Sequence, residues 1–115
     1  MTPTARQALG DHGEALVEQW YAERGYELLA RKWRHSAGEI DLVVRRGRVL
    51  AFCEVKTRTG DRFGTAAEAV NPAKQRRIRL GASAYLRVAP LRFGVVRFDV
   101  ACVHGKEVEV IEAAF

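Results

Sequence analysis

One segment, Val49–Thr57, constrains the fold more than any other part of this sequence. With the two-residue period of a β-strand, it places apolar side chains on both faces over its first half. A strand that is apolar on both faces lies in the middle of a sheet that is covered on both sides. Its second half turns polar, where Glu54 and Lys56 share the face of Leu50 and Phe52. The segment predicts an α/β fold in which charged side chains emerge at the end of a central strand.

The elements around this strand predict the order αβββαββ. Asn71 is a preferred N-cap and Pro72 suits the first helical position, so a long helix begins there. A long helix before the fourth strand allows strands three and four to pair in parallel, whereas the first three strands form an antiparallel meander. The result is a mixed central β-sheet flanked by helices. The expected helices are 4–24 and 72–87, the strands are 26–33, 40–45, 49–57, 93–103 and 107–111, and a polar loop at 61–64 precedes a short helical turn at 65–70.

Length and composition limit the class of protein. A chain of 115 residues with 48% hydrophobic residues suits a single domain over 1–115. Cys53 and Cys102 lie in apolar runs without metal-type spacing, which predicts buried, reduced thiols. The first residues lack a signal-peptide core, and no apolar run approaches the about 20 residues that a membrane span needs. We expect a soluble, cytoplasmic protein with no membrane partner.

Two carboxylates and an amine converge at the end of the central strand. If the hairpin before it turns tightly at 46–47, Asp41 lies opposite Phe52, whereas a register shifted by two residues puts Asp41 directly opposite Glu54. Both registers keep Asp41 on the face that carries Glu54 and Lys56. Neighbouring carboxylates are unfavourable unless a cation lies between them, and oxygen ligands suit a hard divalent ion.

This combination of groups matches metal-assisted phosphodiester hydrolysis. A divalent cation can polarise a phosphoryl oxygen and activate water, and a neighbouring lysine can orient that water or stabilise developing charge. The alternative is that Asp41 and Glu54 form ordinary cross-strand ion pairs with Lys56.

The predicted first helix adds another carboxylate. On a helical wheel, Glu14 lies at the edge of the apolar face and can reach the rim of the site, although a solvated flank position is the alternative. The residues expected on the buried face are Leu9, Gly13, Leu16, Val17 and Trp20.

The predicted second helix carries polar residues at its positive end. Gln75 falls within its buried arc and Lys74 lies at one edge, which suits an anionic ligand near the free N–H groups. A frayed, exposed helix start is the alternative. The buried face of this helix is expected to hold Ile78, Ala82, Tyr85 and Leu86.

The net charge of +5 is concentrated in one part of the chain. Residues 69–98 hold seven basic and no acidic side chains, and the remainder has 12 basic and 14 acidic ones, a net charge of −2. Arg76, Arg77 and Arg79 can hold phosphates without reading sequence. Trp33 beside Arg34 can stack on a base, with packing against the sheet as the alternative.

The strings 38–42 (GEIDL) and 52–58 (FCEVKTR) resemble the PD-(D/E)xK nuclease superfamily, although Ile40 stands where that motif has proline. More closely, the chain resembles the YraN family of small, largely uncharacterised bacterial proteins. Further matching positions are Gly13-Glu14-Ala15, Gly25-Tyr26, Trp33-Arg34, Glu68-Ala69-Val70, Lys74 and Arg97-Phe98-Asp99-Val100.

The resemblance implies a restriction-endonuclease-like core similar to that of archaeal Holliday-junction resolvases. It implies Mg²⁺ or Mn²⁺ as cofactor, Lys56 beside the attacking water, and Gln75 or Lys74 as the accessory polar group. The implied metal ligands are Asp41, Glu54, the backbone carbonyl of Val55, and Glu14. The predicted nucleic-acid contacts are Arg76, Arg77, Arg79, Arg58 and Arg34.

The leading hypothesis is a metal-dependent endonuclease that acts on DNA, including branched or junction DNA. The sequence leaves the oligomeric state open, and a homodimer is what the analogy with resolvases implies. One alternative is a non-catalytic nucleic-acid-binding module that retains the nuclease fold. Another is an interaction protein whose basic helix meets an acidic protein partner.

Overall fold

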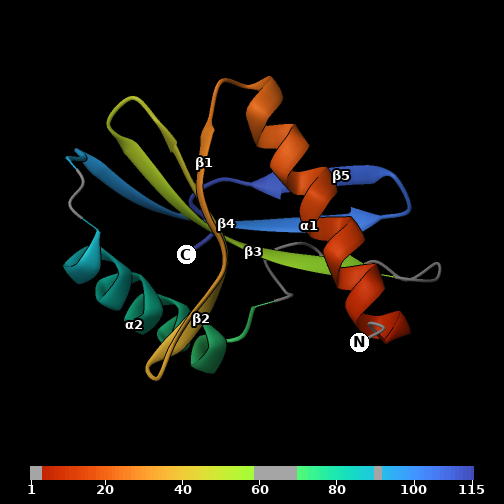
Figure 1. The fold of residues 1–115 in the computed structure, drawn as a ribbon, viewed down its shortest axis with the longest axis horizontal. Helices are drawn as coiled ribbons and strands as arrows, with labels where there is room; N and C mark the ends of the chain where they lie inside the picture. Colours follow the sequence, from red (N-terminus) through yellow and green to blue (C-terminus); the bar gives the residue numbers. More distant parts are fainter. Residues whose placement is uncertain (1–3, 59–69, 90–91) are drawn as a thin grey trace.

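A computed structural model of the chain shows a five-stranded mixed sheet with one helix on each face (Figure 1). The structure describes residues 4–58, 70–89 and 92–115, so the predicted loop at 61–64 and all but the last residue of the predicted turn at 65–70 lie outside the described residues. The order αβββαββ is as predicted and is consistent with a restriction-endonuclease-like core. The elements are α1 (Ala5–Glu23), β1 (Glu27–His35), β2 (Gly38–Arg46), β3 (Val49–Arg58), α2 (Pro72–Val88), β4 (Val95–His104) and β5 (Glu107–Ile111).

Strand β3 lies at the centre of the sheet, as its sequence predicts. The strand order is β1-β2-β3-β4-β5. The pairs β1–β2, β2–β3 and β4–β5 are antiparallel, and β3–β4 is parallel. Helix α2 lies in the connection between the two parallel strands, where the sequence places a long crossover helix.

The turn between β2 and β3 falls at 47–48, one residue later than predicted. Gly47 has a φ of +59°, and glycine at the first position of a two-residue hairpin loop is the residue that such turns favour. The observed pairing, continued by one residue, puts Asp41 opposite Glu54. The tighter register, with Asp41 opposite Phe52, is wrong, and the register shifted by two residues is confirmed.

The core has two layers because β3 is buried on both faces. The alternation predicted for β3 is confirmed, and both cysteines are buried free thiols. Facing α2 are Ile40, Val43, Leu50, Phe52, Ile78, Ala82, Tyr85, Val100 and Cys102. Facing α1 are Val17, Tyr21, Tyr26, Leu42, Val44, Ala51, Cys53, Ala101 and Val103.

Helix α1 is rotated slightly from the predicted orientation. Its buried residues are Gly13, Val17 and Tyr21, whereas Leu16 and Trp20 are only half-buried. The difference has a polar cause, because the hydroxyl of Tyr21 donates a hydrogen bond to a buried carboxylate on β4. The rotation also turns Glu14 toward the sheet, since it lies seven residues, about two turns, before Tyr21.

Helix α1 ends as the sequence predicts. Gly25 adopts a φ of +85°, its N–H donates to the carbonyl of Ala22, and the N–H of Tyr26 donates to the carbonyl of Tyr21. This pair of bonds is a Schellman motif. Among the described residues, no helix combines the length and apolar character that a membrane span requires.

Candidate functional site

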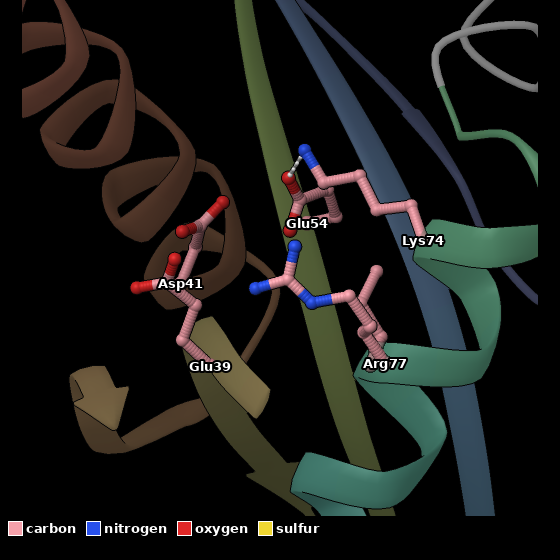
Figure 2. A pocket seen from close by; sticks show the side chains of 6 residues that line it. Glu39, Asp41, Glu54, Lys74 and Arg77 are labelled. Carbon is pink, nitrogen blue, oxygen red and sulfur yellow. Dashed lines mark ion pairs between the residues drawn. The ribbon is translucent and has the colours of Figure 1, made fainter. Parts of the chain in front are cut away.

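A small hollow opens where the first turns of α2 face the neighbouring strands β2 and β3 (Figure 2). Its volume is about 130 Å³, which leaves room for several water molecules. We call it the carboxylate pocket. Three carboxylates, two cations and one apolar side chain line it: Glu39, Asp41, Glu54, Lys74, Arg77 and Ile78.

Buried Glu54 and half-buried Asp41 form the centre of the carboxylate pocket. Glu54 is only 7% exposed, and an oxygen of Asp41 accepts the backbone N–H of Val55 at 2.8 Å. Burial raises the pKa of Glu54 to about 7, and the nearby Asp41 charge acts in the same direction. Burial also raises the pKa of Asp41, while the Val55 N–H and a hydrogen bond from Glu54 oppose that shift. Near pH 7, the two carboxyl groups therefore hold a proton that an exposed pair would lose.

Helix α2 supplies the positive charge in the carboxylate pocket. The ammonium of Lys74 lies 2.6 Å from a carboxylate oxygen of Glu54, and Figure 2 shows Lys74 and Arg77 both reaching from α2 toward the acidic groups. The predicted N-cap is confirmed, since the Asn71 side chain accepts the N–H of Lys74. The alternative of a frayed helix start is therefore not what the structure shows.

A close approach between α2 and β2 sets the position of these cations. A Cβ added at Gly38 would lie 2.2 Å from the carbonyl oxygen of Arg77, and one at Gly81 would lie 3.4 Å from the backbone of Gly38. At Gly38 the backbones can meet only because that position lacks a side chain, whereas a Cβ at Gly81 would make ordinary van der Waals contact. Gly38 thereby lets the first turns of α2 lie over the carboxylates.

Glu14 lies on the α1 side of the same acidic group. Its side chain is 15% exposed, and burial followed by the Asp41 charge raises its pKa, an effect that Lys32 opposes from 3.4 Å. One carboxylate oxygen of Glu14 is buried and has no hydrogen-bond partner among the residues that the structure describes. A second hollow, of about 310 Å³, lies beside it. The edge position predicted for Glu14 is confirmed, and the solvated alternative is not observed.

The predicted amine Lys56 does not line the carboxylate pocket. It is half-buried on β3, two residues beyond Glu54, and none of the described ion pairs joins it to Asp41 or Glu54. Gln75 also points elsewhere, because its amide donates to the backbone carbonyl of Val70 at 3.2 Å. Of the two accessory candidates, the structure brings Lys74 to the carboxylates.

The five predicted nucleic-acid contacts lie in different surroundings. Arg77 lines the carboxylate pocket and Arg76 is exposed nearby. The guanidinium of Arg79 instead covers the rings of Phe98 and Phe115, at 4.7 and 5.3 Å.

The remaining two predicted contacts belong to strands. Arg34 pairs with Glu39 at 3.4 Å on the exposed side of the β1–β2 hairpin, and Arg58 is half-buried at the end of β3. Trp33, beside Arg34, packs edge-on against Tyr85, so the packing alternative describes its position.

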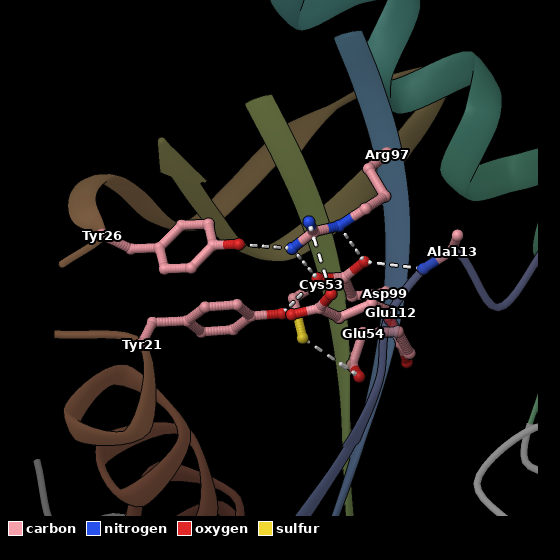
Figure 3. Close-up of polar contacts among 8 residues, drawn as sticks. All are labelled: Tyr21, Tyr26, Cys53, Glu54, Arg97, Asp99, Glu112 and Ala113. Carbon is pink, nitrogen blue, oxygen red and sulfur yellow. Dashed lines mark hydrogen bonds and ion pairs between the residues drawn. The ribbon is translucent and has the colours of Figure 1, made fainter. Parts of the chain in front are cut away.

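A second polar cluster is buried on the α1 face of the sheet (Figure 3). Asp99 is fully buried and accepts two bonds from the guanidinium of Arg97, at 2.8 and 2.9 Å. It also accepts the Tyr21 hydroxyl at 2.6 Å, and Arg97 donates to the Tyr26 hydroxyl at 2.8 Å. These bonds fix α1 to β4 and thereby fix the position of Glu14.

Two side chains near the site are not predicted from the sequence. Glu39 lines the carboxylate pocket, and its place two residues before Asp41 was a readable signal for a shared face. Lys32 turns toward α1 and pairs with Asp11 and Glu14 because its backbone is left-handed, with a φ of 49°. Since that conformation is rare for lysine, nothing in the sequence pointed to it.

Fold and site together define a class: a mixed α/β protein with a pair of carboxylates, one of them buried, at the polar end of its central strand and on the strand beside it. Residues 13–103 match the model of the uncharacterised protein family UPF0102. The chain belongs to this family, which confirms the predicted YraN-family membership.

Several family members resemble this chain over most of its length. A UPF0102 protein of Rhodococcus opacus is 46% identical over 106 residues, which cover 90% of each chain. One of Frankia casuarinae is 50% identical over 86% of this chain and 84% of its own. One of Acidothermus cellulolyticus is 43% identical over 99% of this chain and 98% of its own.

Proposed function

We propose that this protein is a metal-dependent endonuclease that hydrolyses phosphodiester bonds in DNA, including branched or junction DNA. The observation that carries the proposal is the pairing of buried Glu54 with half-buried Asp41, which face Lys74 and Arg77 across one small hollow. Paired acidic oxygens beside cations suit a phosphate diester, because a metal ion and basic side chains can share its negative charge.

The residues of the carboxylate pocket fit Mg²⁺ or Mn²⁺. Mg²⁺ commonly binds through one or two carboxylates, several waters and substrate phosphate, and the hollow has room for such waters. Among the described residues, no three His, Cys, Asp or Glu side chains gather into a ready-made metal cage. The ligands would be Asp41 and Glu54 with the backbone carbonyl of Val55, and Glu14, which lines the neighbouring hollow, would have to turn toward this group to add a fourth ligand.

The raised pKa values support this fit. Burial, followed by the charge of Asp41, raises the pKa of Glu54 to about 7, and Lys74 opposes that shift only in part. A bound divalent cation would stabilise both ionised carboxylates and would polarise a phosphoryl oxygen and activate water.

The chain's own cations have roles beside that group. Arg77 and Lys74 point into the hollow from the start of α2, where they can hold the non-bridging oxygens of a phosphate. Lys74 would then exchange its bond to Glu54 for one to the substrate. Lys56, on the same strand face as Glu54, would stabilise developing charge from the rim of the site.

Cleavage by matched variants tests the proposal. We expect purified wild-type protein with Mn²⁺ to cut duplex, flap or branched DNA, and Glu54→Gln to cut at least about a hundredfold more slowly while still binding DNA. Glu27→Gln removes an exposed carboxylate elsewhere on the sheet and serves as the control. Absence of cutting on all three substrates, or equal cutting by Glu54→Gln, would refute the proposal.

A non-catalytic nucleic-acid-binding module is the second candidate. It is favoured by the ion pair in which Lys74 already occupies one oxygen of Glu54. Such a module would bind DNA equally well with and without a chelator, and Glu54→Gln would leave that binding unchanged.

A further inference from the structure

A basic hollow, separate from the two described above, lies at the tip of the β2–β3 hairpin, away from the carboxylate pocket along β3. Its volume is about 470 Å³, and it is lined by Arg45, Arg48, Arg92 and Phe93. We call it the hairpin hollow. No carboxylate is among its described lining residues, so its charge is entirely positive.

The positive charges of the three guanidinium groups are not balanced by nearby acidic side chains of the described residues. Within the described part of the chain, none of them forms an ion pair with an acidic side chain. The Arg45 side chain is held in place by a bond from its Nε to the carbonyl of Gly47 at 2.9 Å. Arg48 packs against Gly94, where an added Cβ would lie 3.1 Å from its Nε. Three like charges held together without a counter-charge favour a bound anion.

Position and chemistry indicate which anion suits the hairpin hollow. The planar fork of arginine matches phosphate oxygens in pairs. Arg45 lies opposite Leu50 on β3, on the α2 face that also carries Glu54. The four steps from Leu50 to Glu54 span roughly 13 Å at about 3.3 Å each. Measured along the axis of a duplex, that length is the rise of about four nucleotides of one strand, at about 3.4 Å per nucleotide.

We propose that the hairpin hollow is a second phosphate-binding site, which holds the nucleic-acid backbone several nucleotides away from the phosphate at the carboxylate pocket. The inference rests on the proposed function for the identity of the ligand. Its contacts are to the backbone alone, so it adds affinity that falls with salt and reads no sequence.

Binding measured with a chelator present tests this site without requiring cleavage. The double variant Arg48→Gln/Arg92→Gln removes two exposed charges and lowers the net charge from +5 to +3. The control Arg6→Gln/Lys106→Gln makes the same charge change at exposed positions elsewhere. We expect the first variant to bind a duplex of about 24 base pairs about tenfold more weakly, with a salt slope lower by about two, and the control to bind as wild type does.

Three results would overturn the site. One is wild-type affinity and salt slope in the double variant, and another is an equal loss in the control. The third is binding to phosphatidylserine vesicles in place of DNA, with that binding lost in the double variant, which would assign the hollow to a membrane surface. Circular dichroism melting checks that both variants fold.

The site and the proposed function fail separately. One outcome is DNA binding that resists the chelator and depends on Arg48 and Arg92 while Mn²⁺ produces no cleavage. That outcome supports the phosphate-binding site and refutes the proposed nuclease activity. If the double variant instead cleaves DNA normally and binds it with unchanged affinity, the nuclease activity is supported and the phosphate-binding site is refuted.

Discussion

Glu54 combines two properties that a surface carboxylate lacks. It is 7% exposed, and it lies between another carboxyl group and an ammonium group. Burial disfavours its ionised form more strongly than Lys74 favours it, so its pKa rises from 4.5 to about 7. A side chain that titrates near neutral pH inside a polar hollow is typical of a functional position.

This shift predicts how stability depends on pH. Because the folded state holds the proton of Glu54 more tightly than the unfolded chain does, the stabilisation is complete below about pH 4.5 and is lost as pH rises through about 7. A shift of this size corresponds to on the order of 3 kcal/mol. In metal-free buffer, we expect the free energy of unfolding of Glu54→Gln, relative to wild type, to increase by up to that amount from about pH 4.5 to pH 8.

Urea denaturation at a series of pH values measures this difference. Glu27→Gln is the matched control, because it makes the same chemical change at an exposed position on β1. A constant difference between Glu54→Gln and wild type across the range would show that the folded protein does not hold that proton.

At the scale of elements, the approach of α2 to β2 decides which cations reach the acidic pair. Gly38 lets the two backbones touch, and the first turns of α2 then lie over β2 and β3. The α1 side is held by the buried bonds of Asp99. Helix α2 therefore covers the carboxylate pocket, and α1 is fixed independently to the opposite face of the sheet.

Substitution of Gly38 tests this arrangement. We expect Gly38→Ala to destabilise the protein by about 1–3 kcal/mol, because the new Cβ overlaps the carbonyl of Arg77, and to displace Lys74 from Glu54. Gly10→Ala is the control, since nothing lies within 4 Å of its added Cβ and alanine favours a helix, so it should stabilise by about 0.5–1 kcal/mol. Equal thermal stability of the two variants would contradict the tight contact.

Local patterns in the sequence were sufficient to predict much of this architecture. The two apolar faces of β3 predicted its central position, and Asn71 with Pro72 predicted where α2 begins. Whether Lys56 or Lys74 contacts Glu54 was not predictable in the same way. Strand alternation places Lys56 on the correct face, but the amine that reaches Glu54 depends on a helix–strand distance, which is a property of tertiary packing.

At the scale of the whole molecule, two regions of opposite charge meet at the carboxylate pocket. The basic segment 69–98 supplies Lys74 and Arg77, and the acidic remainder supplies Asp41 and Glu54. Counting charges did not reveal that Arg97 is used inside the protein, in its bond to a buried carboxylate. Charge composition therefore indicates the sign of a surface, and only the structure shows which side chains remain available to a partner.

Two neighbouring arginines on α2 offer a matched comparison. Arg77 projects into the carboxylate pocket, whereas Arg79 lies over Phe98 and Phe115. We expect Arg77→Gln to lower the salt slope of DNA binding by about one, and Arg79→Gln to have a smaller effect on binding but to reduce stability by about 1 kcal/mol. Fluorescence anisotropy at several salt concentrations measures the slopes, and equal slopes for the two variants would contradict this difference.

The most direct test of the metal site is calorimetric titration of Mn²⁺ into wild-type protein and into Asp41→Asn. We expect wild type to bind Mn²⁺ with release of a proton, because ligation requires the carboxyl pair to ionise, and we expect Asp41→Asn to lose most of that affinity. Proton release is measured by repeating the titration in buffers with different ionisation enthalpies. Undetectable Mn²⁺ binding by wild type, or equal binding by the variant, would contradict the assignment of Asp41 and Glu54 as metal ligands.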